Sequence, residues 1–284
     1  MDAWKDGKLY RADELTISPY DHGFLYGLGF FETFRTYNGK VFLWEEHWSR
    51  LTRAMVDFRI TMPYEKETLI QAIEALSLAN NNEDGYFRLN ISAGVQDIGL
   101  QPSNYEKPTV ILFRKALHAV PRGTEKSAVW LETLRNSPES PIRHKSHHYA
   151  NNVKARFEVP SLASLEGFFL TSDGFVAEGI TSNIFWAKGG KVYTPSLDTG
   201  ILAGITRDWL IKDSPFVVEE GLFTKDVLEK ADEVFITNSI QEIVPIKKIE
   251  EKYFLGNRGP VYATLHEAYV KCIQKEGTED EFKI

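Results

Sequence analysis

Two β-rich runs on either side of Asn38-Gly39 constrain the fold of this chain more than any other feature. The runs are 30–37 and 40–43, and Asn-Gly between such runs favours a two-residue hairpin turn. Trp44, Trp48, Leu51, Met55 and Phe58 then recur three or four residues apart. This spacing predicts a helix with one apolar stripe, so the chain opens with a strand pair that leads into a helix.

The rest of the pattern predicts an α+β fold in two domains. A helix at 66–80 and strands at 86–93 and 109–113 complete a first domain, 1–117. A segment without a clear period, 118–126, contains Pro121 and Gly123 and predicts a linker. The second domain, 127–284, is mostly strands edged by helices, which indicates a barrel or a strongly curved sheet. Its expected strands are 128–134, 217–219, 233–237 and 242–246, its hairpins turn at Asp173-Gly174 and Gly189-Gly190, and its expected helices are 147–158, 204–212 and 260–274.

Charge and cysteine content exclude several functional classes. Lys plus Arg is 33 and Asp plus Glu is 40, so the net charge is −7, and no basic run suggests a nucleic-acid partner. Cys272 is the single cysteine, which rules out an intrachain disulfide and fits a reducing cytoplasm. No signal peptide and no run of 18 apolar residues is found, so we expect neither export nor a membrane span.

Common catalytic motifs are missing. Gly27-Leu28-Gly29 starts like a dinucleotide fingerprint, but Glu32 stands where the third glycine belongs, so a turn is the better interpretation. The Walker A, Gly-x-Ser-x-Gly and His-Glu-x-x-His motifs do not occur. His144, His147 and His148 lie at helical spacing but beside cations rather than carboxylates, so we expect no metal site.

Three segments carry chemistry when they are taken together. Lys145 lies among cations ahead of a helix, which can make its amine a nucleophile, although a solvated surface lysine is the simpler interpretation. Glu178 ends a hairpin strand, where a carboxylate can pair with a pyridinium or merely cap a turn. Gly204-Ile205-Thr206-Arg207 opens a helix whose N–H groups can bind phosphate or simply be capped.

In order and spacing these segments resemble the fold type IV pyridoxal-phosphate enzymes, the class IV aminotransferase family. The resemblance rests on Lys145 with Tyr149, Glu178-Gly-x-x-Ser-Asn, Gly204-Ile-Thr-Arg, Thr237-Asn-Ser ahead of Glu242-x-x-Pro, and upstream Phe31-Glu32 and His47-x-x-Arg50-Leu51. It covers about residues 20–250. It implies a smaller N-terminal α/β sandwich, a larger C-terminal barrel-like domain, pyridoxal 5′-phosphate as the cofactor and a homodimer.

The resemblance also implies a role for individual residues. Lys145 would bind the cofactor covalently and move protons, and Glu178 would pair with the pyridine nitrogen. Tyr149 would reach the phenolic oxygen of the cofactor, although the branched-chain enzymes carry one more residue between lysine and tyrosine. The phosphate would be held by Arg50, Ile205, Thr206, Asn238 and Ser239.

Within the family, Phe31-Glu32-Thr33-Phe34-Arg35, Ser92-Ala93-Gly94 and Lys145-Ser-His-His-Tyr are most similar to aminodeoxychorismate lyases. The resemblance therefore implies elimination of pyruvate from 4-amino-4-deoxychorismate to give para-aminobenzoate for folate synthesis. A branched-chain or D-amino acid aminotransferase is the alternative, and the arginine and histidine of the D-amino acid type are missing after the 86–93 strand. Cations that could face the two carboxylates of such a substrate are Arg35, Arg88, His147 and His148.

Overall fold

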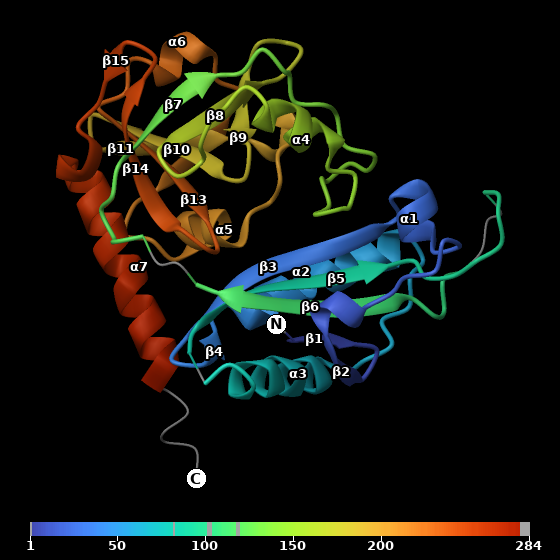
Figure 1. Ribbon diagram of the computed structural model, residues 1–284. Coiled ribbons are helices and arrows are strands. Elements are labelled where there is room, and N and C mark those ends of the chain that lie inside the picture. Colours follow the sequence, from blue (N-terminus) through green and yellow to red (C-terminus); the bar gives the residue numbers. More distant parts are fainter. Residues whose placement is uncertain (1, 82, 101–103, 118–119, 279–284) are drawn as a thin grey trace. The chain divides into compact units, whose positions relative to one another are not determined.

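The computed structural model describes residues 2–81, 83–100, 104–117 and 120–278. The chain divides into two compact units (Figure 1). The first comprises Met1–His118 and His144–His148, and the second comprises Ala119–Arg143 and Tyr149–Ile284. The predicted domains, 1–117 and 127–284 with a linker at 118–126, remain a prediction, and residues 1, 82, 101–103, 118, 119 and 279–284 of them lie outside the described residues.

The first unit is built on one antiparallel sheet of six strands in the order β2-β1-β6-β5-β3-β4. The strands are β1 (Asp2–Lys5), β2 (Lys8–Arg11), β3 (Gly29–Tyr37), β4 (Lys40–Val41), β5 (Gly85–Ser92) and β6 (Thr109–Ala116). The helices of this unit are α1 (His22–Tyr26), α2 (Trp44–Asp57) and α3 (Lys66–Leu78).

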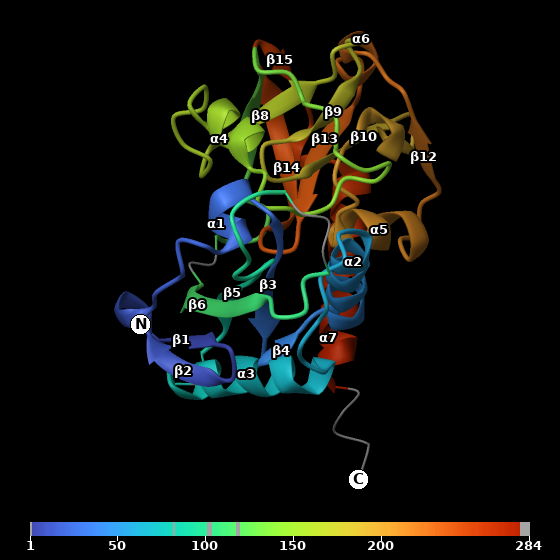
Figure 2. The same ribbon diagram turned by 90° about the vertical axis from the view of Figure 1, so that its right-hand side faces the viewer.

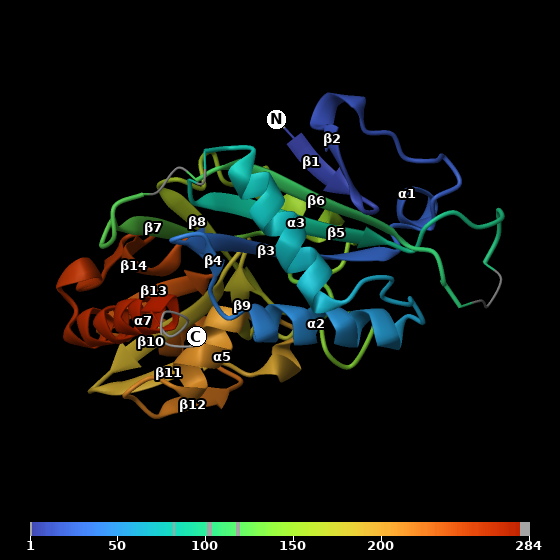
Figure 3. The same ribbon diagram turned by 90° about the horizontal axis from the view of Figure 1, so that it is seen from below.

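Alternation along the strands places the core of the first unit on one face of its sheet. Phe34 of β3 lies opposite Phe87 of β5 with the rings stacked, and α2 and α3 cover this face (Figure 3). Leu51 and Leu76, both buried, come from the apolar stripes of the two helices. The other face carries the half-buried positions of β3 and β5, and many of these are polar.

The second unit is a nine-stranded sheet in the order β12-β11-β10-β13-β14-β7-β8-β9, with β15 paired to β14. The strands are β7 (Lys126–Trp130), β8 (Leu165–Leu170), β9 (Val176–Gly179), β10 (Asn183–Lys188), β11 (Lys191–Pro195), β12 (Val218–Gly221), β13 (Glu233–Asn238), β14 (Glu242–Ile249) and β15 (Lys252–Tyr253). The sheet is strongly curled (Figure 2). Its two ends meet, because Phe175 beside β9 forms a bridge with Thr224 just after β12.

Helices and two apolar clusters complete the second unit. The helices are α4 (Ala150–Arg156), α5 (Ile205–Lys212), α6 (Lys225–Leu228) and α7 (Pro260–Thr278). One cluster centres on Trp186 and Ile236 inside the curl, and another packs Phe169 against Ala155 of α4. Among the described helices, none has the length and apolar composition that crossing a membrane requires.

The structure confirms most predicted elements and corrects two. The hairpins at Asn38-Gly39, Asp173-Gly174 and Gly189-Gly190 form as expected. The helix predicted at 147–158 begins only at Ala150, because the preceding segment bonds to β3 in extended form. The strand predicted at 128–134 is shorter and earlier, Lys126–Trp130.

Candidate active site

Lys145 is held beside the edge of β3 by backbone hydrogen bonds. Its carbonyl accepts from the N–H of Phe31 at 2.9 Å, and the N–H of His147 donates to Gly29 at 2.9 Å. Ser146 and Phe30 form the bridge between these two bonds. The segment 144–148 therefore behaves as a short added strand of the first sheet, which fixes the point from which the lysine side chain starts.

Cationic side chains lie against the ring of Phe31 on the polar face of the first sheet. The Nζ of Lys145 lies 4.6 Å from the ring centroid, and the Cζ of Arg88 lies 3.7 Å from it. His147 stacks on the same ring at 6.2 Å. Burial, assisted by the charge of Arg88, lowers the pKa of His147 to about 4. The ring of Phe31 therefore has the lysine amine, the arginine guanidinium and a neutral imidazole around it.

The three histidines of this segment make separate contacts. His144 Nε2 lies 2.8 Å from a carboxylate oxygen of Asp57, and His148 Nε2 lies 3.3 Å from the carbonyl oxygen of Tyr26. The Nε2 atom of His147 is buried and finds no hydrogen-bond partner among the described residues. Across those residues, no group of three or more His, Cys, Asp or Glu side chains is arranged to hold a metal ion.

Arg50 belongs to a buried charge cluster of the first unit. Its Nε and Nη2 atoms donate to Glu32 at 2.8 and 2.6 Å, and Nδ1 of His47 contacts the same carboxylate at 2.7 Å. Burial opposes the charge of Glu32, but Arg50 and His47 outweigh it and lower the pKa of Glu32 to about 2. Burial also lowers the pKa of His47. The carboxylate thus fixes the direction of the Arg50 guanidinium, which is 12% exposed.

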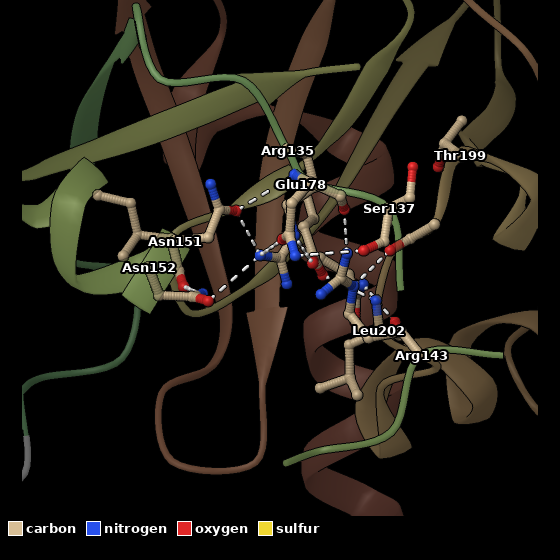
Figure 4. Close-up of polar contacts among 12 residues, drawn as sticks. Arg135, Ser137, Arg143, Asn151, Asn152, Glu178, Thr199 and Leu202 are labelled. Atoms are coloured by element: carbon tan, nitrogen blue, oxygen red, sulfur yellow. Dashed lines mark hydrogen bonds and ion pairs between the residues drawn. The ribbon is translucent and has the colours of Figure 1, made fainter. Parts of the chain in front are cut away.

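Glu178 lies at the end of β9 in the second unit and is nearly inaccessible to solvent (Figure 4). Its Oε1 accepts from Nε of Arg135 at 2.7 Å, and its Oε2 accepts from the N–H of Leu202 at 3.0 Å. The guanidinium partner suits the ionised carboxylate, and each oxygen retains acceptor capacity for another donor.

Amide side chains hold Arg135 in turn. Its Nη1 donates to Asn151 at 2.7 Å and to Asn152 at 3.2 Å, both on α4 (Figure 4).

Arg143 donates hydrogen bonds to the carbonyl oxygens of Asn136 and Gly200, and burial together with the charge of Arg135 lowers the pKa of Arg143 to about 10. Tyr149 is half-buried immediately before α4.

The N-terminus of α5 is connected directly to the Glu178 region. The segment that begins at Leu202 leads to Gly204, the residue preceding the helix, and no side chain of the described residues caps this helix. Asn183 packs against Gly204 so closely that an added Cβ would lie 2.0 Å from its Oδ1. Ile205 and Thr206 are both buried, so their N–H groups start the helix in a site shielded from water.

Asn238 is the last residue of β13 and Ser239 follows it, close to Asn183 of β10. Asn183 is the register partner of Thr237, and Nδ2 of Asn238 donates to the carbonyl of Thr181 at 3.3 Å. The Oγ1 of Thr237 is buried and has no hydrogen-bond partner in the described part of the chain. The segment 181–183 thus brings the start of α5 and the end of β13 together.

The predicted residues therefore fall into two groups. Lys145 and Arg50 belong to the first unit, and Tyr149, Glu178, Ile205, Thr206, Asn238 and Ser239 belong to the second. Sequence reasoning missed Arg135, which lies in a stretch without a period, so no pattern marks it. Glu32 and His47 lie in the sequence motifs without a predicted role of their own, although a carboxylate in a buried strand is itself an unusual signal.

A family model described as amino-transferase class IV matches residues 29–249. The chain therefore belongs to the class IV aminotransferase family, and the expected two-domain α+β fold is confirmed. Pyridoxal phosphate is the cofactor of this family, and one solved branched-chain aminotransferase similar to this chain holds pyridoxamine 5′-phosphate.

Named relatives include both a lyase and a transaminase. An aminodeoxychorismate lyase from Bacillus subtilis is 43% identical over 95% of this chain and 94% of its own. A solved branched-chain aminotransferase from Thermoproteus uzoniensis is 28% identical, with a TM-score of 0.86 over 97% of this chain and 96% of that one. A solved 4-amino-4-deoxychorismate lyase from Pseudomonas aeruginosa is 26% identical, with a TM-score of 0.82 over 95% of this chain and 98% of that one.

Proposed function

We propose that this protein is a pyridoxal-phosphate-dependent 4-amino-4-deoxychorismate lyase that releases pyruvate and leaves para-aminobenzoate, a precursor of folate. The observation that carries the proposal is the 43% identity to the Bacillus subtilis aminodeoxychorismate lyase over 95% of this chain. A cytoplasmic location belongs to the same proposal, since a single cysteine fits a reducing compartment.

The second unit has features that fit the cofactor. The uncapped start of α5 offers N–H groups to a phosphate, and the orphaned Oγ1 of Thr237 lies beside it. We assign the phosphate to Ile205, Thr206, Asn238 and Ser239, with Arg50 of the first unit as its guanidinium partner. Glu178 would hold the protonated pyridine nitrogen, and Tyr149 the phenolic oxygen. When bound, the cofactor supplies an electron sink for the carbon that loses a proton.

Lys145 has two tasks in this proposal. Its amine would hold the cofactor, and it would also remove the proton from the ring carbon that bears the amine of the substrate. The C–O bond to the enolpyruvyl group would then break with its electron pair going to oxygen, and the proton taken up by Lys145 would pass to that oxygen to give enolpyruvate, which becomes pyruvate. The remaining ring becomes aromatic, which supplies much of the driving force.

Arg135 donates to Oε1 of Glu178 at 2.7 Å and would thereby fix the direction of the carboxylate for its contact with the pyridine nitrogen. On the first unit, Arg88 beside Lys145 is our first candidate for a substrate carboxylate, since both cations lie over the Phe31 ring. Arg35, which lies over Tyr37, and His148 are further candidates, while His147 would act as a neutral hydrogen-bonding group.

The test is to incubate the cofactor-loaded protein with aminodeoxychorismate in the absence of any keto acid and to follow both products. We expect para-aminobenzoate and pyruvate to appear in equal amounts over many turnovers. If neither forms while D-alanine, glutamate or a branched-chain amino acid converts the cofactor to pyridoxamine phosphate, the protein is a transaminase. The similarity to a branched-chain aminotransferase structure makes that the second candidate.

A homodimer is part of the proposal. Two segments of the first unit, 17–26 and 94–100, are joined by a hydrogen bond from the N–H of Gly99 to Tyr26 Oη at 2.8 Å. They expose Phe24, Ile98 and Leu100 to 68, 67 and 80%. Apolar side chains gathered in this way are typical of a protein interface, and we assign this surface to the second copy of the chain.

A further inference from the structure

The turn that joins β13 to β14 carries Asn238 and Ser239, and its shape is set by the side chain of Asn238. The Oδ1 atom of Asn238 accepts from the N–H groups of Ile240 and Gln241 at 3.0 and 2.8 Å. These two bonds fix the start of the turn. Glu242, the first residue of β14, is the register partner of Asn238.

Glu242 adopts a backbone conformation that ordinarily favours glycine. Its φ is +64°, and its side chain is only 4% exposed. An L-residue with a side chain is strained in this region, and a carboxylate is costly to bury without a partner. A glycine would avoid both costs. The presence of glutamate therefore indicates that the carboxylate itself is used.

Arg122 binds this carboxylate with two parallel hydrogen bonds. Nε donates to Oε2 at 2.8 Å, and Nη2 donates to Oε1 at 2.9 Å. Paired bonds between planar groups fix orientation as well as distance. Lys126, four residues after Arg122, donates to Oε1 of Gln241 at 3.0 Å. The segment that contains Arg122 and Lys126 therefore contacts the turn at two successive residues, Gln241 and Glu242.

We propose that Arg122 and Glu242 are positioning residues for the cofactor phosphate. The pair fixes the β13–β14 turn in the one conformation that presents Asn238 and Ser239 to the phosphate beside the start of α5. This inference rests on the proposed function, which assigns the phosphate to these residues. Both residues would act on the phosphate only through the turn.

The test compares two probes that differ only in the phosphate. Dissociation constants for pyridoxal 5′-phosphate and for pyridoxal are measured from tryptophan fluorescence on the cofactor-stripped full chain and on Arg122→Gln, Glu242→Gln and Glu242→Gly. We expect each variant to bind pyridoxal 5′-phosphate about ten-fold more weakly, with pyridoxal affinity changed less than about two-fold. Glu242→Gly is the sharpest variant, because it relieves the backbone strain while removing the carboxylate.

Lys188→Gln is the matched control, since it removes an exposed ion pair of the same unit, with Asp232 at 2.7 Å. It should leave both constants unchanged. The inference is overturned if all three variants keep the wild-type preference for pyridoxal 5′-phosphate over pyridoxal. It is also overturned if Glu242→Gly binds pyridoxal 5′-phosphate as tightly as the wild type does. In both cases the proposed function stands. A wild-type chain that binds both probes equally contradicts the phosphate assignment of the proposed function, and the inference falls with it. Circular dichroism of each variant verifies folding, and half-exposed Arg122 gives the variant least prone to misfold.

Discussion

Glu32 carries a negative charge in a place that water does not reach. Arg50 and His47 surround it, and its pKa falls from 4.5 to about 2 despite burial. Because the folded-state pKa lies below the unfolded one, this carboxylate stabilises the fold above about pH 4.5 and loses that effect as the pH falls to about 2. The difference corresponds to about 3 kcal/mol of unfolding free energy.

We therefore expect Glu32→Gln to lower the unfolding free energy at pH 7 by about 3 kcal/mol. Between pH 4.5 and 2 the variant should also lose less stability than the wild type does. Urea unfolding followed across this range measures both effects. Glu67→Gln, at an exposed position of α3, is the control. Parallel pH profiles for the Glu32 variant and the wild type would contradict the assignment.

Lys145 gives a second prediction at this scale. After incubation with pyridoxal 5′-phosphate and reduction by borohydride, the wild type should carry one pyridoxyl group, located by mass spectrometry on the peptide that contains Lys145. Lys145→Ala should carry none there and should lose turnover by at least about a thousand-fold, because it loses both the covalent anchor and the base. Lys154→Ala, in α4, should behave as the wild type. Full activity in Lys145→Ala would exclude the proposed chemistry.

At the scale of elements, two glycines with nearly the same φ should respond differently to substitution by alanine. Gly39 turns the β3–β4 hairpin at φ +82° with open space around it, whereas Gly94 follows β5 at φ +81° and faces the Lys107 carbonyl 2.1 Å from an added Cβ. Gly39→Ala should cost about 1 kcal/mol, and Gly94→Ala about 3 kcal/mol or more, since a backbone carbonyl must move. Denaturant unfolding measures both values. Equal costs would show that the β5–β6 loop yields easily.

Elements with a strong local signal were the ones that the sequence could predict. The Asn38-Gly39 hairpin and the stripe of α2 form as expected because turn chemistry and apolar spacing act within a few residues. The sequence predicts a helix from residue 147, but His147 instead bonds to Gly29 of β3, more than a hundred residues earlier, and the helix begins at Ala150. The contact between Arg135 and Glu178 spans 43 residues and follows no period, so only the fold reveals it.

For the whole molecule, the proposed homodimer can be measured directly. Light scattering after size exclusion should give twice the chain mass of 32.4 kDa. Leu100→Asp should shift the protein toward a monomer, because a charge would have to be buried in the interface. Val56→Asp makes the same chemical change at another exposed apolar residue of the first unit and should leave the mass unchanged. A wild type with the mass of one chain would contradict the proposal.

The added strand at 144–148 also affects how the protein can be made. The first unit is not complete when residue 118 has been synthesised, because the β3 edge at Phe30 and Phe31 still lacks its partner. At ribosomal rates of about 5–20 residues per second, the missing piece follows roughly 1.5 to 6 seconds later. During that interval an apolar strand edge is open to pairing with a neighbouring nascent chain. Crowded translation, rather than the finished enzyme, is therefore where this protein is most exposed to aggregation.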